Sequence, residues 1–254
     1  MAYWFPSREW LAAYRERLND NETYETMSEG WGVDFEGDFV FEITDLPTAE
    51  TTIGDLPEDL SESLRENLAS LSEERIEELI ADAPSALEER FEEQEHVENE
   101  RERFISALCG TTIEDAPRVT WPDLRSEYPE DLANLLDQLD RYLDGSTVYT
   151  YLDLYDGRCR TAEVLEQTDE RNAGFVLTAP YSKWNDLIDG ADVIESVMSQ
   201  DMSLDGSITN VILYPEAAQE LGDTAGRIET NFLFNFLESA ISRTLNYHAC
   251  VAEP

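Results

Sequence analysis

The spacing of apolar and polar positions divides the chain into three stretches. In the first, residues 7–18 repeat apolar side chains at helical spacing behind Ser7, a suitable N-cap, and a second short helix is expected over 22–29. Residues 37–43 then alternate between apolar and polar positions, which predicts a strand that ends before Pro47.

The second stretch, residues 47–144, has helical spacing throughout. Its third predicted helix is almost entirely polar in the middle, so little apolar surface holds that part in place. We therefore expect an all-helical segment between two regions that contain strands. Four helices are predicted, over residues 60–71, 76–83, 84–108 and 129–143.

Strand patterns return in the third stretch, after Gly145. Two alternating runs flank Asp156-Gly157, a dipeptide typical of two-residue hairpin turns. Short strands and helices then follow one another, which makes α+β the predicted fold class. The expected strands cover 147–154, 158–165, 173–178 and 202–204; the expected helices cover 181–189, 192–199, a turn around 211–212, a segment after Pro215 and a tail from Asn231 that includes Phe236.

Charge changes this picture. The chain has 57 acidic and 17 basic residues, a formal net charge of -40. Such a field repels nucleic-acid phosphates and anionic membrane surfaces, which excludes both as expected partners. Disorder is disfavoured because the chain contains 5 Trp, 11 Tyr and 10 Phe. With Lys183 its single lysine, the chain is instead typical of a protein that works in multi-molar salt, where the Debye length is about 3 Å or less.

The acids are unevenly distributed. Residues 50–144 hold 28 of the 57, and their borders coincide with the changes in apolar spacing. Several predicted helices carry repulsive four-residue pairs such as Glu73 with Glu77. The segment 47–144 is therefore interpreted as an acidic helical insertion that depends on screening by salt.

Few residues suggest chemistry. The chain has no phosphate loop, GxGxxG, GxSxG or HExxH motif. Of its two histidines, His96 lies in the acidic stretch, and His248 with Cys250 is too small a set for a metal site. Asp153 is interpreted as an outward-facing strand carboxylate. We therefore expect no catalytic residues, no metal and no cofactor.

Location is predicted from what the sequence lacks. Three cysteines, an odd number, argue against a disulfide framework and for a reducing compartment. No apolar run reaches 18 residues, and the first residues do not resemble a signal peptide. A cytoplasmic protein without stable membrane insertion is expected.

A resemblance to a known family links these observations. Phe5-Pro-Ser-Arg-Glu-Trp10 and the strand 37–43 look like the start of archaeal members of the sterol carrier protein type 2 family. Over residues 148–157 the chain is similar to the family's hairpin, and over 173–184 to its next strand and helix start; 187–190, 202–206 and Ala217-Ala218 fit as well. The segment 47–144 has no counterpart in the family.

The resemblance implies a mainly antiparallel five-stranded sheet, covered by helices, that encloses a tunnel for fatty acyl, isoprenoid or sterol-like molecules. It implies a lipid-binding domain formed by 1–46 and 145–233, interrupted by the insertion 47–144 and followed by a C-terminal helical extension, 234–254. An apolar core is the simpler interpretation of each pocket residue taken alone. The residues assigned to the pocket are Trp184, Ile188, Val193, Val197, Met198, Met202 and Leu204.

The leading hypothesis is therefore a non-enzymatic carrier of a hydrophobic molecule. A second is a protein–protein interaction module that acts through 47–144, and a third is a component of an acyl-handling enzyme. Apart from a hydrophobic ligand, the expected partners are another protein or a second copy of the chain, bound through 47–144 or the C-terminal helix.

Overall fold

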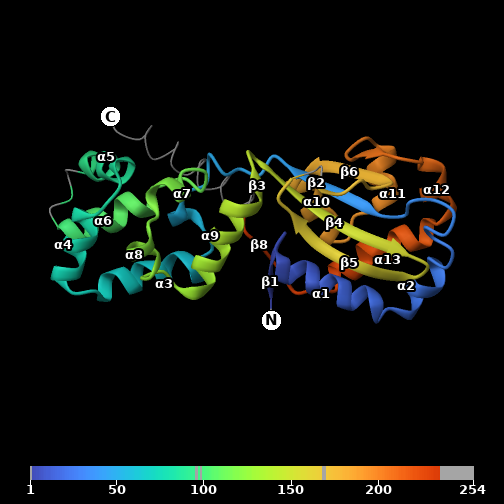
Figure 1. Ribbon diagram of the computed structural model, residues 1–254, viewed down its shortest axis with the longest axis horizontal. Helices are drawn as coiled ribbons and strands as arrows, with labels where there is room; N and C mark the ends of the chain where they lie inside the picture. The colour runs from blue at the N-terminus through green and yellow to red at the C-terminus, as the bar shows by residue number, and fades with distance from the viewer. Residues whose placement is uncertain (1, 95–96, 98, 168–169, 235–254) are drawn as a thin grey trace, which may run out of the picture. The chain divides into compact units, whose positions relative to one another are not determined.

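The computed structural model describes residues 2–94, 97, 99–167 and 170–234, and the chain forms two units (Figure 1). The first, the sheet unit, combines residues 1–46 with the chain from Thr147 onward. The second, the helical unit, is Pro47–Ser146.

Five strands of the sheet unit form one sheet in the order β5-β4-β2-β6-β7. Three of the four pairings are antiparallel, and the central pair, β2 with β6, is parallel. The predicted five-stranded, mainly antiparallel α+β arrangement is confirmed, with a mixed rather than strictly antiparallel sheet. A two-residue strand, β3 (Leu143–Asp144), precedes β4 along the chain. The five strands are β2 (Phe39–Thr44), β4 (Thr147–Tyr155), β5 (Arg158–Leu165), β6 (Phe175–Pro180) and β7 (Ser203–Asp205).

The turn between β4 and β5 is the predicted hairpin. Asp156 and Gly157 have φ angles of 44° and 78°, both positive as a type I′ turn requires. A side chain at Gly157 would also collide with backbone, because its Cβ would lie 2.8 Å from the carbonyl oxygen of Glu25. Local turn chemistry thus fixes this part of the fold.

Helices cover one face of the sheet. The first begins as predicted, because the Ser7 side chain accepts a hydrogen bond from the backbone N–H of Trp10 at 3.1 Å. It is tied to β5 by a reciprocal pair: Asn19 donates to the carbonyl of Cys159 at 2.9 Å and accepts from its N–H at 3.0 Å. The helices of this unit are α1 (Arg8–Asn19), α2 (Glu22–Met27), α10 (Tyr181–Ile188), α11 (Val193–Met198), α12 (Ile208–Leu213) and α13 (Pro215–Gly226).

A separate two-stranded parallel ribbon joins β1 (Tyr3–Phe5) to β8 (Thr230–Phe232). The predicted tail helix is therefore wrong at its start, since residues 230–232 are a strand. The buried Tyr181 hydroxyl holds this segment by accepting from the N–H of Leu233 at 3.1 Å and donating to the carbonyl of Phe5 at 3.3 Å. The rest of the predicted helix, with Phe236 and the extension beyond residue 234, lies outside the described residues.

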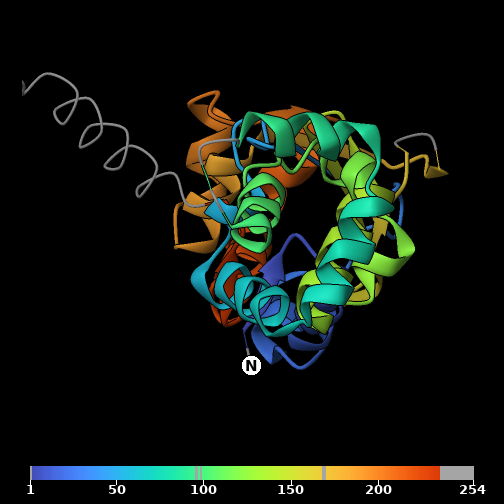
Figure 2. The ribbon, with the colours of Figure 1, turned by 90° about the vertical axis from the view of Figure 1, so that its left-hand side faces the viewer.

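The helical unit consists of short helices, coloured cyan to yellow-green in Figures 1 and 2. Its core is made of buried leucines such as Leu64 and Leu132, at the apolar positions that the sequence predicts. Two of its helices, of four residues each, and a 3-10 turn (Ile53–Asp55) were not predicted. The helices are α3 (Glu58–Ser70), α4 (Glu73–Ala81), α5 (Ser85–Glu93), α6 (Glu100–Cys109), α7 (Ala116–Val119), α8 (Pro122–Arg125) and α9 (Glu130–Tyr142).

The single helix predicted over 84–108 is wrong: the structure has two, α5 and α6. Gln94 caps the end of α5, and Asn99 caps the start of α6 by accepting from the N–H of Glu102 at 3.1 Å. An asparagine side chain competes for backbone hydrogen bonds and favours a helix start over a helix interior. The polar stretch between the caps supplies too little apolar surface to oppose the break.

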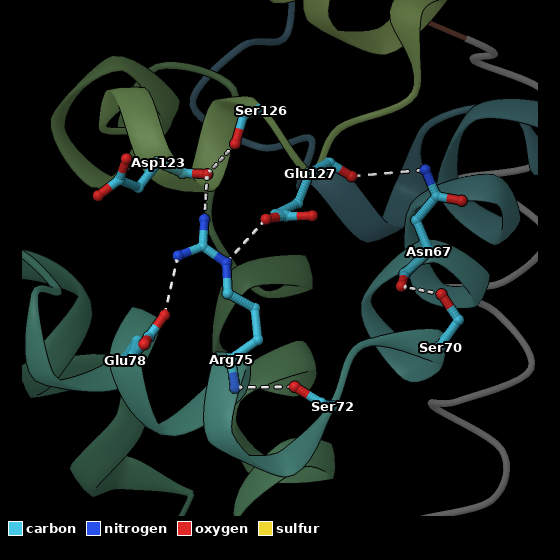
Figure 3. A network of polar contacts seen from close by, with 8 residues as sticks. All are labelled: Asn67, Ser70, Ser72, Arg75, Glu78, Asp123, Ser126 and Glu127. Carbon is cyan, nitrogen blue, oxygen red and sulfur yellow. Dashed lines mark hydrogen bonds and ion pairs between the residues drawn. The ribbon is translucent and has the colours of Figure 1, made fainter.

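Arginines connect the helices of this unit. Arg75 on α4 donates to the Glu127 carboxylate at 2.9 Å, to Glu78 at 3.2 Å and to the carbonyl of Asp123 at 3.5 Å (Figure 3). Arg101 donates to carbonyl oxygens at the end of α3, those of Ala69 and Leu71, at 2.9 and 2.8 Å. The few cations of this acidic unit thus satisfy helix carbonyls and carboxylates within it.

Candidate hydrophobic binding site

The sheet unit contains an apolar pocket between the helix-covered face of its sheet and the helices above. The pocket has a volume of about 90 Å³. It is lined by Phe5, Trp10, Leu11, Tyr14, Phe39, Phe41, Ile43, Thr150, Leu177, Trp184, Leu187, Ile188, Val193, Val197, Leu204, Val211, Ala218, Leu221, Gly222 and Ala225.

Strand register builds the floor of the pocket. In β2, alternate residues point to one face, so that Phe39, Phe41 and Ile43 all line the pocket. Phe41 pairs with Thr150 of β4 on one side and with Leu177 of β6 on the other. Leu177 in turn pairs with Leu204 of β7, which completes a row of four lining residues across four strands.

The helix α13 forms the opposite wall and makes the space. Ala218, Leu221, Gly222 and Ala225 follow one another at helical spacing and face the pocket. Three of these four residues are small. A Cβ at Gly222 would lie 3.1 Å from Cγ2 of Val193 on α11, so glycine at this position lets the two helices approach closely.

The lining carries no charge among the described residues, and nearly all of its polar atoms are hydrogen-bonded away from the pocket. The Trp10 indole N–H donates to Thr230 Oγ1 at 2.8 Å, the Trp184 N–H to the carbonyl of Ala179 at 3.2 Å, and the Tyr14 hydroxyl to the carbonyl of Leu221 at 2.9 Å. Burial raises the pKa of Tyr14 well above its ordinary value, so the phenol stays neutral. An uncharged lining of this kind, within the part of the chain that the structure describes, favours contact with apolar groups.

A second, smaller cavity of about 30 Å³ lies beside the first. The two share Phe39, Val211, Ala218 and Leu221 in their linings. At the shared wall, the Phe39 ring stacks on Phe175 at a centroid distance of 4.9 Å and on Trp31 at 5.9 Å. The two spaces are therefore separated by side chains that belong to both linings.

Two solved structures are similar to the chain. The crystal structure of sterol carrier protein 2 has a TM-score of 0.45 and 17% identity, over 87% of this chain and 97% of that one. The solution structure of a conserved hypothetical protein from Thermus thermophilus, described as a candidate sterol carrier protein, has a TM-score of 0.44 and 18% identity, over 89% and 90%. No protein-family model and no curated protein matches the chain.

The structure brings five of the seven predicted pocket residues together: Trp184, Ile188, Val193, Val197 and Leu204 line the pocket. Their role in binding a ligand stays a prediction.

Met198 and Met202 do not line it. Met198 is 66% exposed, because it follows Val197 by about 100° around α11 and so faces away from the pocket face that Val193 and Val197 share. Met202 is buried, but it precedes β7, which begins at Ser203, so the strand does not set the direction of its side chain.

Sequence reasoning missed the wall formed by α13 and the contributions of Leu11 and Tyr14 on α1. The signal was present in α13, where the pocket residues recur at positions i, i+3, i+4 and i+7 from Ala218. Their small size made this stripe look weakly apolar, although small residues are what leave room for a cavity.

One aspartate, the cysteines and the histidines were also considered from the sequence as candidates for catalysis or metal binding. Asp153 accepts two hydrogen bonds from Arg160, at 3.0 and 2.7 Å, as an outward strand carboxylate can. Cys109 and Cys159 are free and buried, and burial raises the pKa of Cys159 to about 12. His96, His248 and Cys250 lie outside the described residues.

Two searches of the described residues gave negative results. Within this part of the chain, no group of three or more His, Cys, Asp or Glu side chains is placed to hold a metal ion. No described helix combines the length and apolar character needed to cross a membrane.

Proposed function

We propose that the sheet unit binds and carries a hydrophobic small molecule, such as a fatty acyl, isoprenoid or sterol-like lipid, without catalysing a reaction. The observation that carries this proposal is the wholly uncharged lining of the pocket, which joins sheet, α1, α10, α11 and α13 around one space. Burial of apolar ligand surface is the interaction that such a lining favours, at about 0.8 kcal/mol per methylene. A chain of some twelve carbons would gain on the order of 10 kcal/mol before entropy costs.

The pocket must enlarge to hold such a ligand. Its volume of about 90 Å³ is below the roughly 300–1,000 Å³ of typical ligand sites. Union with the neighbouring cavity adds about 30 Å³, so a wall must also move. On this proposal the pocket is closed before the ligand binds.

The helix α11 is the wall best suited to move. None of its six residues is buried, whereas α1 and α10 each bury four. Few buried contacts mean a low free energy of local opening. Displacement of α11 removes Val193 and Val197 from the lining and opens the pocket on the side of β7.

Native mass spectrometry and lipid titration of the full chain in about 3 M KCl test the proposal. We expect a co-purifying lipid, or saturable binding of a fluorescent fatty acid that non-fluorescent lipids displace. Substitution of Ala218→Leu fills the wall shared by both cavities and should weaken binding at least tenfold. Ala12→Leu, on the exposed side of α1, is the matched control and should leave binding unchanged. Absence of any bound or titratable lipid in the wild-type chain would refute the proposal.

A further inference from the structure

We propose that Thr150 is the polar anchor of the pocket, and that the ligand presents one neutral hydrogen-bonding group, an alcohol or a ketone, to its hydroxyl. This inference rests on the proposed function and narrows it, because it assigns chemistry to the deep end of the bound molecule. It also names a specificity-determining residue in a lining that is otherwise apolar.

The position of Thr150 carries the first part of the argument. The residue lies in β4, is 1% exposed, and belongs to the pocket lining. Its neighbours across the strands are Val164 of β5 and Phe41 of β2, neither of which offers a side-chain hydrogen-bond partner. Among the described residues, none hydrogen-bonds to Thr150 Oγ1.

The contrast with the other polar residues of the pocket carries the second part. Trp10, Tyr14 and Trp184 each direct their polar atom to a protein acceptor, so they contribute only apolar surface to the pocket. Thr150 alone among these described lining residues keeps an unused donor and acceptor. A buried hydroxyl without a partner is costly, and valine fills the same volume at no such cost. The hydroxyl is therefore explained by a partner that arrives with the ligand.

The charge of the surroundings restricts that partner. The described lining contains no arginine, lysine or histidine to neutralise an anion beside Thr150. Burial of a carboxylate or phosphate there would be prohibitive, whereas a hydroxyl or carbonyl group needs only one hydrogen bond. The anionic head of a lipid, if present, must stay at the other end.

The order of the strands shows where the end of the pocket away from Thr150 lies. Thr150 in β4 is separated from Leu204 in β7 by β2 and β6, a distance of roughly 14 Å at about 4.8 Å per strand. Helix α11 is tied to the start of β7, because the backbone N–H of Met202 donates to the carbonyl of Ser196 at 3.1 Å. A ligand that enters beside α11 thus reaches Thr150 with its leading end.

Competition binding of a matched set of probes to the full chain in about 3 M KCl tests this. The probes are 1-decanol, n-undecane, which replaces the hydroxyl by a methyl group, and decanoate, all measured by displacement of a fluorescent fatty acid. We expect Thr150→Val to lower the preference for 1-decanol over n-undecane about five- to tenfold, the range of one net hydrogen bond. Thr150→Ser should keep the preference, and Thr150→Ala is a second hydroxyl-free variant with the same expected loss.

Thr178→Val is the matched control, because Thr178 lies on the opposite face of the sheet and donates to Glu42 at 2.7 Å. It should leave the preference unchanged. Equal preferences in the wild type, Thr150→Val and Thr150→Ala, with both probes bound, would overturn the role of Thr150 and leave the proposed function standing. Failure of every probe, the fluorescent fatty acid included, to bind the wild type would overturn both.

Discussion

The apolar pocket of the sheet unit differs from the main cavity of the helical unit in the chemistry of its lining. The helical unit contains a cavity of about 370 Å³, and Glu114, Arg125 and Asp140 are among the side chains that line it. The pocket of the sheet unit is about a quarter of that volume and is lined without a charge. Volume alone would select the wrong cavity, because a space bordered by ions favours water; this holds also for a cavity of about 390 Å³ in the sheet unit, which Glu16, Arg17 and Asp20 help to line. The chemistry of the lining is the better guide to a site for a hydrophobic ligand.

The units also differ in what holds them together. The sheet unit relies on strand pairing and on buried aromatic residues, whereas the helical unit carries about half of the acids on short helices and ties them with arginines such as Arg75 and Arg101. We propose that the helical unit is dispensable for ligand binding. Three predictions test this contrast.

The largest effect is expected from the removal of salt. As KCl falls from about 3 M to 0.1 M, the Debye length rises to about 10 Å and pairs such as Glu73 with Glu77 begin to repel. The helical unit should lose most of its helicity while the sheet unit persists. Hydrogen exchange followed peptide by peptide, with circular dichroism, measures this. Equal protection of residues 47–146 at both salt concentrations would contradict the prediction.

A core substitution in one unit should show, at constant salt, whether the stability of that unit affects lipid binding. Leu64 on α3 is fully buried, so Leu64→Ala should destabilise the helical unit by about 3 kcal/mol. Urea unfolding in 3 M KCl gives the free energy of unfolding, and lipid titration should show unchanged affinity. Leu152→Ala is the matched change in the sheet unit, where the residue is also fully buried, and it should weaken both stability and binding. Weaker lipid binding by Leu64→Ala would show that the units depend on one another.

The smallest effect is expected from Tyr181→Phe. This change removes the hydrogen bonds with Phe5 and Leu233. It should lower the free energy of unfolding of the sheet unit by about 1–2 kcal/mol, as measured by urea unfolding in 3 M KCl. Burial raises the pKa of Tyr181 above its ordinary value of 10.0. Because the neutral phenol is favoured in the folded state, its contribution is present below pH 10 and declines as the pH rises further. The stability of Tyr181→Phe should fall less steeply above pH 10 than that of the wild type.

Local rules predicted much of the fold. The Asp156-Gly157 turn and the Ser7 cap depend on a few adjacent residues, and both were identified from the sequence. The parallel ribbon of β1 and β8 was not, because strands at opposite ends of the sheet unit meet only in the tertiary structure. The helix start at Asn99 was not predicted, because helical spacing alone does not show that an asparagine side chain competes for the backbone N–H of Glu102.

The candidate site was predicted to the extent that apolar spacing reveals it. Val193 and Val197, four residues apart on one helix, were assigned to the pocket and line it. Met198 was assigned for its apolar character alone, and its direction depends on helix phase. Thr150 could not be found from the sequence, since its significance lies in the lack of a partner, which only the packed structure reveals.

The pairing of Ile43 with Val148 has a consequence for biosynthesis. These residues are neighbours in adjacent strands, yet the whole of Pro47–Ser146 is translated between them. At about 5–20 residues per second, β2 leaves the ribosome roughly 5–20 s before β4 does. During that interval an apolar strand destined for the centre of the sheet has no partner on either side, while the helical unit can already fold. The insertion thus lengthens the time for which β2 is exposed in the nascent chain, compared with a chain in which β4 follows β2 directly.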